Sequence, residues 1–433
     1  MDILRTLPAE SCVCGKDHKA AVREVYSGSG ALEYLPGSLK NAGVKNVFVL
    51  ADVNTYQAAG EAVCHCLQTA GIPFSQYVFP DGDIEPDEQS VGSAIMHYDG
   101  DCDAVVAVGS GVINDIGKIL SHTAGVGYYI VATAPSMDGY ASATSSMSRD
   151  GLKVSLPTKC ADVIIGDTDI LCRAPEKMLR AGLGDMVAKY ISICEWRIAH
   201  LITGEYYCEQ VAAMIRCALD RCVENAGGLL RREPAAVEAV FEGLVLGGLA
   251  MAYAGVSRPA SGVEHYFSHI WDMRGLAFGT KVDLHGLQCA VGTWLAAKEY
   301  ARLPELKPDK EKALSHAKTF DFPAWAEKLR LFLGKGAEAM IAQEEKEKKY
   351  DPALHRVRLT HIIENWERIL EIIEEEIPTL DALDRLFEKA GLPRTPVELG
   401  ISDEITDMVF AATKDIRDKY VLSRLLWDLG ERI

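Results

Sequence analysis

The sequence lacks an excess of basic residues and any long uncharged apolar run, and we expect it to lack a signal peptide. Its 45 Lys and Arg stand against 62 Asp and Glu, which gives a formal net charge of −17. Because binding to phosphates of nucleic acids needs a basic surface, this balance argues against a nucleic-acid partner. The start, MDILRTLPAES, has neither the basic region nor the apolar core of a signal peptide. We therefore expect a cytoplasmic protein without membrane insertion.

Cysteine is also sparse, with 12 residues scattered over 433. Scattered thiols favour a reducing compartment over a disulfide framework. Two clusters resemble metal motifs, CVCGKDH at residues 12–18 and VCHC at residues 63–66. Zinc sites usually space their cysteines by about two to four residues and add a second pair of ligands. Buried or partly buried thiols are therefore the better interpretation of both clusters.

The composition is that of a globular protein, with 48% hydrophobic and 25% charged residues, and the length of 433 residues predicts about two domains. Apolar runs at 44–52, 103–111 and 127–135 alternate with helical segments, which predicts a parallel sheet with crossover helices. From about residue 170 onward, apolar residues recur at helical spacing. We predict a Rossmann-like α/β domain over residues 1–170 and an all-α domain over residues 171–433.

A glycine-rich turn joins an apolar strand to a helix in AVVAVGSGVINDIGKIL, residues 104–120. Gly109 and Gly111 permit a tight turn and let a pyrophosphate approach the backbone, where the helix N-terminus favours its charge. Asp52 closes the preceding strand and suits two roles, holding an adenosine ribose or capping the next helix. In the usual dinucleotide fingerprint the acidic residue follows the glycines by about 20 residues. The order here therefore departs from that of ordinary dehydrogenases.

Three histidines in the second half form a candidate metal site. His265 and His269 are four residues apart and would share one face of a helix, and His285 follows. Histidines at this spacing are also common as structural residues. Asp185, on an otherwise apolar helical stretch, is a candidate acid ligand or a helix cap. Together, Asp185, His265 and His285 favour a catalytic divalent-metal site with an open position.

The motifs GSGVINDIGK, TAPSMDGYAS, GLGDMVAKY, SRPASGVEHYFSH and LHGLQCAVGT occur in this order along the chain. Their order and approximate spacing resemble those of the sn-glycerol-1-phosphate dehydrogenases, within the iron-containing alcohol dehydrogenase and dehydroquinate synthase superfamily. The match covers residues 20–300, and IRDKYVLSRLLWDLG resembles the closing helix of longer bacterial members. The resemblance implies a dehydroquinate synthase-like two-domain architecture. It also implies metal-dependent hydride transfer between NAD(P)H and dihydroxyacetone phosphate, giving sn-glycerol 1-phosphate.

The resemblance also implies a set of binding residues. Asp185, His265 and His285 would bind one divalent metal, which is zinc or nickel in this branch and iron in some relatives. NAD(H) or NADP(H) would lie with its adenosine side at Asp52 and its nicotinamide near Ser142. Two loops would line the rest of the cofactor: Gly109, Ser110, Gly111, Val112, Ile113, Thr133, Ala134, Pro135 and Ser136. Valine at position 112 replaces an expected threonine, which would weaken a phosphate contact.

Substrate contacts are expected from Asp138 and Asp185. Asp138 would orient a hydroxyl of the triose, although an ordinary Asx turn is the alternative. His269 would relay a proton or donate a hydrogen bond to substrate, unless it is a structural histidine. Arg258 and Lys189 are candidates for the substrate phosphate because they lie near the motifs. The expected catalytic residues are therefore Asp185, His269 and Asp138.

Three alternatives remain open from the sequence: a lyase of the dehydroquinate synthase type, a metal-dependent glycerol or polyol dehydrogenase, and a catalytically silent nucleotide-binding protein. TAPSMDGY and SRPASG argue against the first two, and the three candidate metal ligands argue against the third. Glu195 stands where many relatives carry aspartate. The expected partner is a small phosphorylated triose, and a homodimer is the default assembly for an enzyme of this size.

Overall fold

The computed structural model describes residues 12–19, 22–150, 152–280 and 282–432. The chain divides into two compact units. Unit 1 holds the residues up to Met186 together with Gln210–Val256, and unit 2 holds Val187–Glu209 and the residues from Ser257 onward. The strands end close to the predicted change at residue 170, but unit 1 also includes helices that follow it. This division into compact units therefore falls at residues other than 170 and 171. The domain boundary between residues 170 and 171 stays a prediction.

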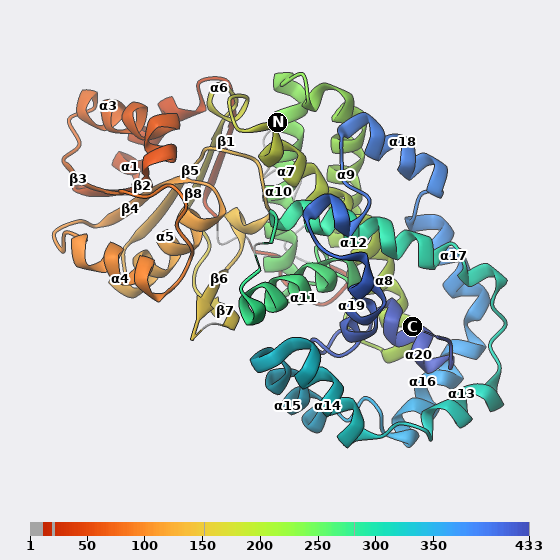
Figure 1. Ribbon diagram of the computed structural model, residues 1–433. Helices are drawn as coiled ribbons and strands as arrows, with labels where there is room; N and C mark the ends of the chain where they lie inside the picture. The colour runs from red at the N-terminus through yellow and green to blue at the C-terminus, as the bar shows by residue number, and fades with distance from the viewer. Residues whose placement is uncertain (1–11, 20–21, 151, 281, 433) are drawn as a thin grey trace. The chain divides into compact units, whose positions relative to one another are not determined.

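Six parallel strands form the main sheet of unit 1, in the order β1-β8-β5-β4-β2-β3 (Figure 1). The predicted apolar runs contain β2, β4 and β5, so these three strands are confirmed. A separate antiparallel hairpin pairs β6 with β7, which the sequence analysis did not predict. The strands are β1 Glu24–Gly28, β2 Val47–Asp52, β3 Phe74–Phe79, β4 Ala104–Gly109, β5 Gly127–Ala132, β6 Thr144–Arg149, β7 Leu152–Pro157 and β8 Val163–Asp167.

Helices cover both faces of this sheet, which explains why its central strands are apolar throughout. Val106 and Val108 of β4 belong to the core shared with α1 and α3. Ala107 points the other way and meets α5, where Gly117 has no side chain to keep the helix away. The helices of unit 1 are α1 Leu35–Asn41, α2 Val53–Thr55, α3 Glu61–Thr69, α4 Glu88–His97, α5 Gly111–Ala124, α6 Thr168–Leu171, α7 Glu176–Val187, α9 Glu209–Leu229 and α10 Pro234–Ala254.

The strand order changes direction between β2 and β4. The chain runs from β2 outward to β3, and then returns to place β4 on the other side of β2. In parallel sheets, ligands bind beyond the carboxyl ends of the strands at such a switch point. Asp52 ends β2 and Gly109 ends β4, so both residues lie at this point. The topology thus brings together two of the predicted cofactor residues.

Helix α10 is long and apolar enough to cross a membrane by length and composition. However, 78% of its most apolar window is buried within the structure. It packs against β1, α6 and the short 3-10 helix η4, Gly139–Ala141, all in unit 1. The apolar character of α10 is therefore that of a core helix.

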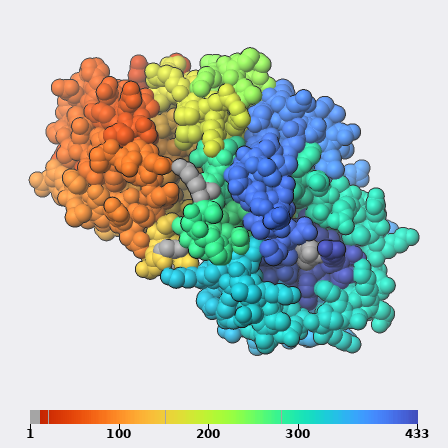
Figure 2. Space-filling model, in the orientation of Figure 1, coloured from red at the N-terminus to blue at the C-terminus, as the bar shows by residue number. Residues whose placement is uncertain are grey.

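Unit 2 is helical throughout the part of it that the structure describes. Helix α11 packs against α12, α14 and α19, and α8 contacts α11, α12, α16 and α17. Figure 2 shows the surface of the residues from Ser257 onward in green to blue. Its helices are α8 Lys189–Thr203, α11 Val263–Phe278, α12 His285–Tyr300, α13 Lys310–Ala317, α14 Phe322–Leu333, α15 Ala337–Glu347, α16 Pro352–Glu364, α17 Trp366–Glu376, α18 Leu380–Ala390, α19 Thr406–Thr413 and α20 Leu422–Asp428. Together with unit 1, they confirm the predicted fold class.

Candidate active site

The glycine turn after β4 has the predicted form, a strand that ends where α5 begins. A Cβ atom on Gly109 would lie 2.6 Å from the Cβ of Ile113, so only glycine fits there. Ile113 is buried and covers Gly109, and it can therefore offer only its backbone to a ligand. Ser110 precedes the helix without capping it through its side chain. The first N–H groups of α5 thus remain available for an anion.

The loop after β5 is hydrogen-bonded to this turn. Thr133 donates its N–H to the carbonyl oxygen of Gly109 at 3.1 Å. The hydroxyl of Ser110 lies 2.6 Å from that of Ser136 and 3.1 Å from that of Tyr140, and Tyr140 also donates to the carbonyl oxygen of Ala134. The structure therefore joins the two predicted cofactor loops, 109–113 and 133–136, at the carboxyl ends of neighbouring strands.

Asp52 is a helix cap in this structure. Its carboxylate accepts hydrogen bonds from the N–H groups of Asn54 and Thr55 at 2.8 and 2.9 Å. Thr55 completes the capping box by accepting the N–H of Asp52. Both bonds use Oδ1, and a cap at the switch point does not prevent the second carboxylate oxygen from meeting a ribose. The ribose contact stays a prediction.

Asp185 is fully buried inside α7 and does not cap the helix. Its Oδ2 accepts the N–H of Asp138 at 3.0 Å, so the two predicted substrate residues lie together in unit 1. One turn earlier, a Cβ on Gly182 would lie 1.8 Å from the carbonyl oxygen of Pro135. The missing side chain lets α7 approach the loop after β5. Asp185 thereby reaches the same loop that carries the predicted cofactor residues.

The three histidines of unit 2 converge. The ring centroids of His265 and His285 are 5.0 Å apart, and His269 lies 6.5 Å from His265 and 6.0 Å from His285. Desolvation, followed by the positive charge of Arg417, lowers the pKa of His269 well below its usual value. This shift favours the neutral form of the imidazole. Residues from α11 and α12 therefore form one imidazole cluster, and metal binding by it stays a prediction.

Cys289 joins this cluster, which the sequence analysis did not predict. Its Sγ lies 3.6 Å from Nε2 of His285, and the ligand atoms of His265, His285 and Cys289 all lie within 4.8 Å of one another. Burial alone would raise the pKa of the Cys289 thiol, but the two imidazoles lower it. The spacing of four residues from His285 to Cys289 was a signal in the sequence, because it places both on one helix face.

Side chains on α11 orient both imidazoles. Oε1 of Glu264 lies 2.8 Å from Nδ1 of His265, and a carboxylate only accepts, so this Nδ1 carries the proton and Nε2 presents a lone pair. The Ser268 hydroxyl lies 2.9 Å from Nδ1 of His285. Such partners are typical of metal-binding histidines. The donor set therefore fits a divalent metal at the two Nε2 atoms.

Glu195 ties together three helices of unit 2. It accepts hydrogen bonds from the N–H of Leu422 at the start of α20 and from the N–H of Val263 at the start of α11. Tyr300 of α12 also lies 3.3 Å from its carboxylate. Burial, followed by the negative charge of Glu264, raises the pKa of Glu195 to about 8. Its contacts show a positioning role for the helices that carry the histidines.

The two basic candidates for the substrate phosphate have structural partners. Arg258 forms a double hydrogen bond with the carboxylate of Glu205, at 2.6 and 2.5 Å, and donates to the carbonyl oxygen of Tyr420. Lys189 is fully buried and donates to the carbonyl oxygen of Ala260 at 3.1 Å. These contacts favour a role in holding unit 2 together. Phosphate binding by either residue stays a prediction.

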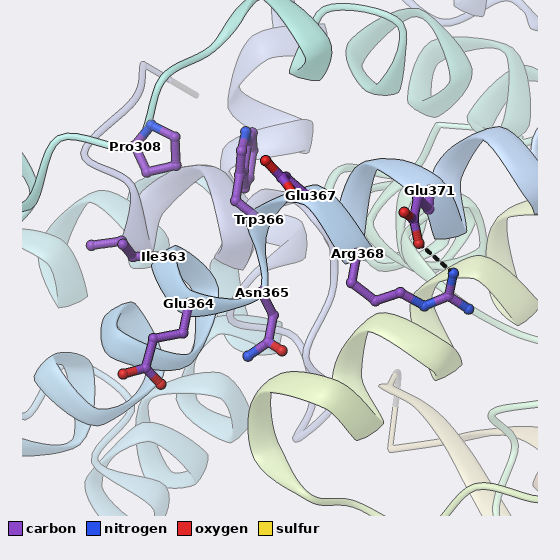
Figure 3. Close-up of a pocket in the computed structure, with 8 residues that line it drawn as sticks. All are labelled: Pro308, Ile363, Glu364, Asn365, Trp366, Glu367, Arg368 and Glu371. Carbon is purple, nitrogen blue, oxygen red and sulfur yellow. Dashed lines mark hydrogen bonds and ion pairs between the residues drawn. The ribbon is translucent and has the colours of Figure 1, made fainter.

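Two further features are the hydroxyl of Ser142 and a pocket in unit 2. The hydroxyl of Ser142 lies 3.0 Å from that of Thr144, two residues later in the chain. The position of Ser142 near the nicotinamide stays a prediction. A pocket of about 550 Å³ lies elsewhere in unit 2 (Figure 3). It contains none of the predicted site residues. Its lining is Pro308, Ile363, Glu364, Asn365, Trp366, Glu367, Arg368 and Glu371.

Comparison with known proteins identifies relatives of the whole chain. It is 29% identical to a glycerol-1-phosphate dehydrogenase (NAD(P)+) of Halalkalibacterium halodurans over 98% of this chain and 96% of the relative. It is 33% identical to the enzyme of the same name from Bacillus licheniformis, over 70% of this chain and 76% of the relative. Residues 26–175 also match the family of iron-containing alcohol dehydrogenases.

Solved structures share the fold. A probable glycerol dehydrogenase from Sinorhizobium meliloti aligns with a TM-score of 0.57 at 18% identity, covering 94% of this chain and 97% of that one. A 1,3-propanediol oxidoreductase aligns with a TM-score of 0.60 at 15% identity, with the same coverage of both chains. These two similarities concern the fold alone, whereas the sequence matches extend to the family. The chain therefore belongs to the glycerol-1-phosphate dehydrogenase family of the iron-containing alcohol dehydrogenases, and it is an oxidoreductase.

Proposed function

We propose that this enzyme interconverts dihydroxyacetone phosphate and sn-glycerol 1-phosphate with NAD(P)H, using one divalent metal. The observation that carries the proposal is the pair of imidazoles whose centroids lie 5.0 Å apart, with Glu264 and Ser268 at their Nδ1 atoms. The names of its relatives supply the substrate and the cofactor. A divalent metal suits the site because neutral imidazoles and a carboxylate are its common ligands in catalytic centres.

The metal ligands would be Asp185, His265 and His285. Zinc, nickel and iron all accept this ligand set, so the donors leave the choice among them open. When bound, the metal would act as a Lewis acid on the substrate ketone. Glu264 and Ser268 would keep the two Nε2 lone pairs aimed at it, while the Asp138 N–H would hold one oxygen of Asp185.

The other predicted site residues would bind the cofactor and orient the substrate. The N–H groups at the start of α5 would receive the pyrophosphate, and the carboxylate of Asp52 would meet the adenosine ribose and disfavour a 2′-phosphate. Asp138 would orient a hydroxyl of the triose. Because desolvation favours the neutral form of His269, its imidazole would be able to accept the proton of the product alcohol or return it. Hydride transfer itself belongs to the nicotinamide.

The test follows NADH absorbance with metal-free protein and dihydroxyacetone phosphate while zinc, nickel or ferrous ion is added back. We expect metal-dependent oxidation, and a product recognised by an enzyme specific for sn-glycerol 1-phosphate. Unphosphorylated dihydroxyacetone is the matched control and should react poorly. Equal rates with both ketones would favour a polyol dehydrogenase, and no net NADH oxidation with any metal would contradict the proposal in favour of a lyase.

The proposed ligand set is tested by His285→Ala. Loss of one imidazole should abolish metal-dependent turnover, because the remaining two ligands hold a divalent ion weakly. Turnover and metal content per chain measure this, with His122→Ala, an exposed histidine in the last turn of α5, as the control. An active His285→Ala protein with undiminished metal would refute the assignment. The cytoplasmic location and the homodimer stay predictions beside this function.

A further inference from the structure

The N-terminal segment CVCGKDH forms a compact turn that the proposed function does not use. Gly15 donates its N–H to the carbonyl oxygen of Cys12 at 3.0 Å, with a φ of +81° that suits glycine. Because of this turn, Cys12 and Cys14 can face one ion although only one residue separates them in the chain. The ligand atoms of Cys12, Cys14 and His18 all lie within 4.8 Å of one another.

The end of α10 supports this turn. Nδ1 of His18 lies 3.3 Å from the carbonyl oxygen of Tyr253, and the Tyr253 ring contacts the imidazole edge-on with centroids 5.7 Å apart. Lys16 donates from Nζ to the neighbouring carbonyl oxygen of Ala254 at 2.7 Å. All of these residues belong to unit 1. Two side chains of the turn therefore hold it against the last turn of one core helix.

The contact with Tyr253 also determines the tautomer of His18. A carbonyl oxygen can only accept a hydrogen bond, so the Nδ1 that faces it carries the proton. Nε2 is left with its lone pair, and it lies 3.3 Å from Sγ of Cys14. Metal-bound histidines use this arrangement, one ring nitrogen held by a backbone carbonyl and the other bound to the ion.

We propose that Cys12, Cys14 and His18 bind a zinc ion, separate from the catalytic metal. Two thiolates and an imidazole are ligands that favour zinc over magnesium or calcium. In a tetrahedral zinc site, sulfur and nitrogen ligands lie about 3.5 Å apart, because Zn–S is about 2.3 Å and Zn–N about 2.0 Å. The distance from Cys14 Sγ to His18 Nε2, 3.3 Å, fits this geometry.

The ion has a structural role in this proposal. Three of its four coordination positions are filled by residues 12–18, and the fourth is left to a further ligand. Because zinc would close a short loop whose His18 and Lys16 contact α10, it would hold the N-terminal segment on unit 1. The second cluster of the sequence has no such arrangement among the described residues: the Cys64 thiol donates to the side-chain oxygen of Gln76 instead.

The first experiment replaces the bound metal with Co²⁺ in the full-length protein. Cobalt bound to thiolates gives a sulfur-to-metal charge-transfer band in the near ultraviolet, which a site of carboxylate and imidazole ligands does not give. We expect the band to be lost in Cys14→Ser and kept in Cys64→Ser, a matched half-buried thiol, and in Cys289→Ser. A band that survives in Cys14→Ser, or that disappears with Cys289→Ser alone, would overturn the proposal.

A second measurement leaves the N-terminal cluster intact. The His285→Ala protein, which has lost a proposed catalytic ligand, is dialysed with zinc and then against buffer, and its zinc is quantified. We expect about one zinc per chain to remain, and X-ray absorption at the zinc edge should show sulfur neighbours at about 2.3 Å. Protein that retains no zinc, or retains zinc without sulfur neighbours, would refute the site.

Discussion

At the scale of single residues, the site is built from side chains that are oriented by their hydrogen-bond partners. Asp52 caps α2 through Oδ1, and His265 faces Glu264 with Nδ1. Ser268 does the same for His285, although nothing in the spacing of the sequence pairs these two residues. Each partner therefore selects the atom that the functional residue would present to a ligand. Single substitutions at these positions should therefore alter the binding of cofactor or metal without altering the fold.

The substitution Asp52→Asn distinguishes the role of Asp52 as a helix cap from its predicted contact with the adenosine ribose. Asparagine caps a helix about as well as aspartate, so the free energy of unfolding should change little. Loss of the negative charge should raise kcat/KM with NADPH relative to NADH, because the charge repels a 2′-phosphate. The matched control is Asp87→Asn, which changes the cap of α4 and should leave the cofactor ratio unchanged. If the NADPH-to-NADH ratio is also unchanged in Asp52→Asn, Asp52 acts only as a helix cap.

Ser268→Ala removes the hydroxyl beside Nδ1 of His285. Metal affinity should fall by about 10-fold to 100-fold, as it does when partners of metal-binding histidines are removed. Turnover should recover at high metal concentration, because the ligands themselves remain. Metal titration of activity measures this, with Ser121→Ala, a buried serine bonded within α5, as the control. An unchanged metal affinity would show that Ser268 does not position His285.

At the scale of elements, glycines allow helices to approach their neighbours closely, because glycine has no side chain. A Cβ on Gly292 of α12 would lie 2.4 Å from the carbonyl oxygen of Glu264 on α11. The close approach of these two helices places His285 beside His265. In unit 1, Gly182 serves the same purpose between α7 and the loop that carries Pro135. The glycines in GLGD and LQCAVG are thus part of the site although they bind nothing.

Gly182→Ala should therefore disturb both stability and activity. The added methyl group meets the Pro135 carbonyl, and overpacking of this kind costs about 1–3 kcal/mol. The shift of α7 should also weaken the hydrogen bond from Asp138 to Asp185 and lower metal affinity. Urea unfolding and metal titration measure the two effects. Gly92→Ala is the control, because that helical glycine has open space around it and should gain about 0.5–1 kcal/mol.

The elements show what the sequence could predict. Strands β2, β4 and β5 and the start of α5 were predictable because each is a local apolar run that ends in turn chemistry. Helical spacing and the family motifs predicted Asp185, His265 and His285 as metal ligands. The partners Glu264 and Ser268, the thiol of Cys289 and the addition of α9 and α10 to unit 1 were not predicted. These depend on how helices cross, and crossing is decided by packing between distant parts of the chain.

At the scale of the whole molecule, the proposed catalytic metal is a ligand of the folded state, so its binding should stabilise the protein against unfolding. At a free metal concentration of about 100 times the Kd, a ligand of the folded state adds about 2.7 kcal/mol to the free energy of unfolding. Calorimetry of metal-free and metal-loaded protein should therefore show one transition that moves to higher temperature. His285→Ala should lack most of this shift. A transition temperature that metal leaves unchanged would contradict the proposed metal site.

The division of the chain has a consequence for how this protein can be cut or recombined. The chain passes between the units at three places, after Met186, after Glu209 and after Val256. A single break therefore yields neither unit whole: a fragment that ends at Met186 lacks α10, which packs on β1, and the remainder carries α10 without its sheet. Exchange of one unit between relatives requires three coordinated breakpoints. We therefore expect the two units to be inherited together.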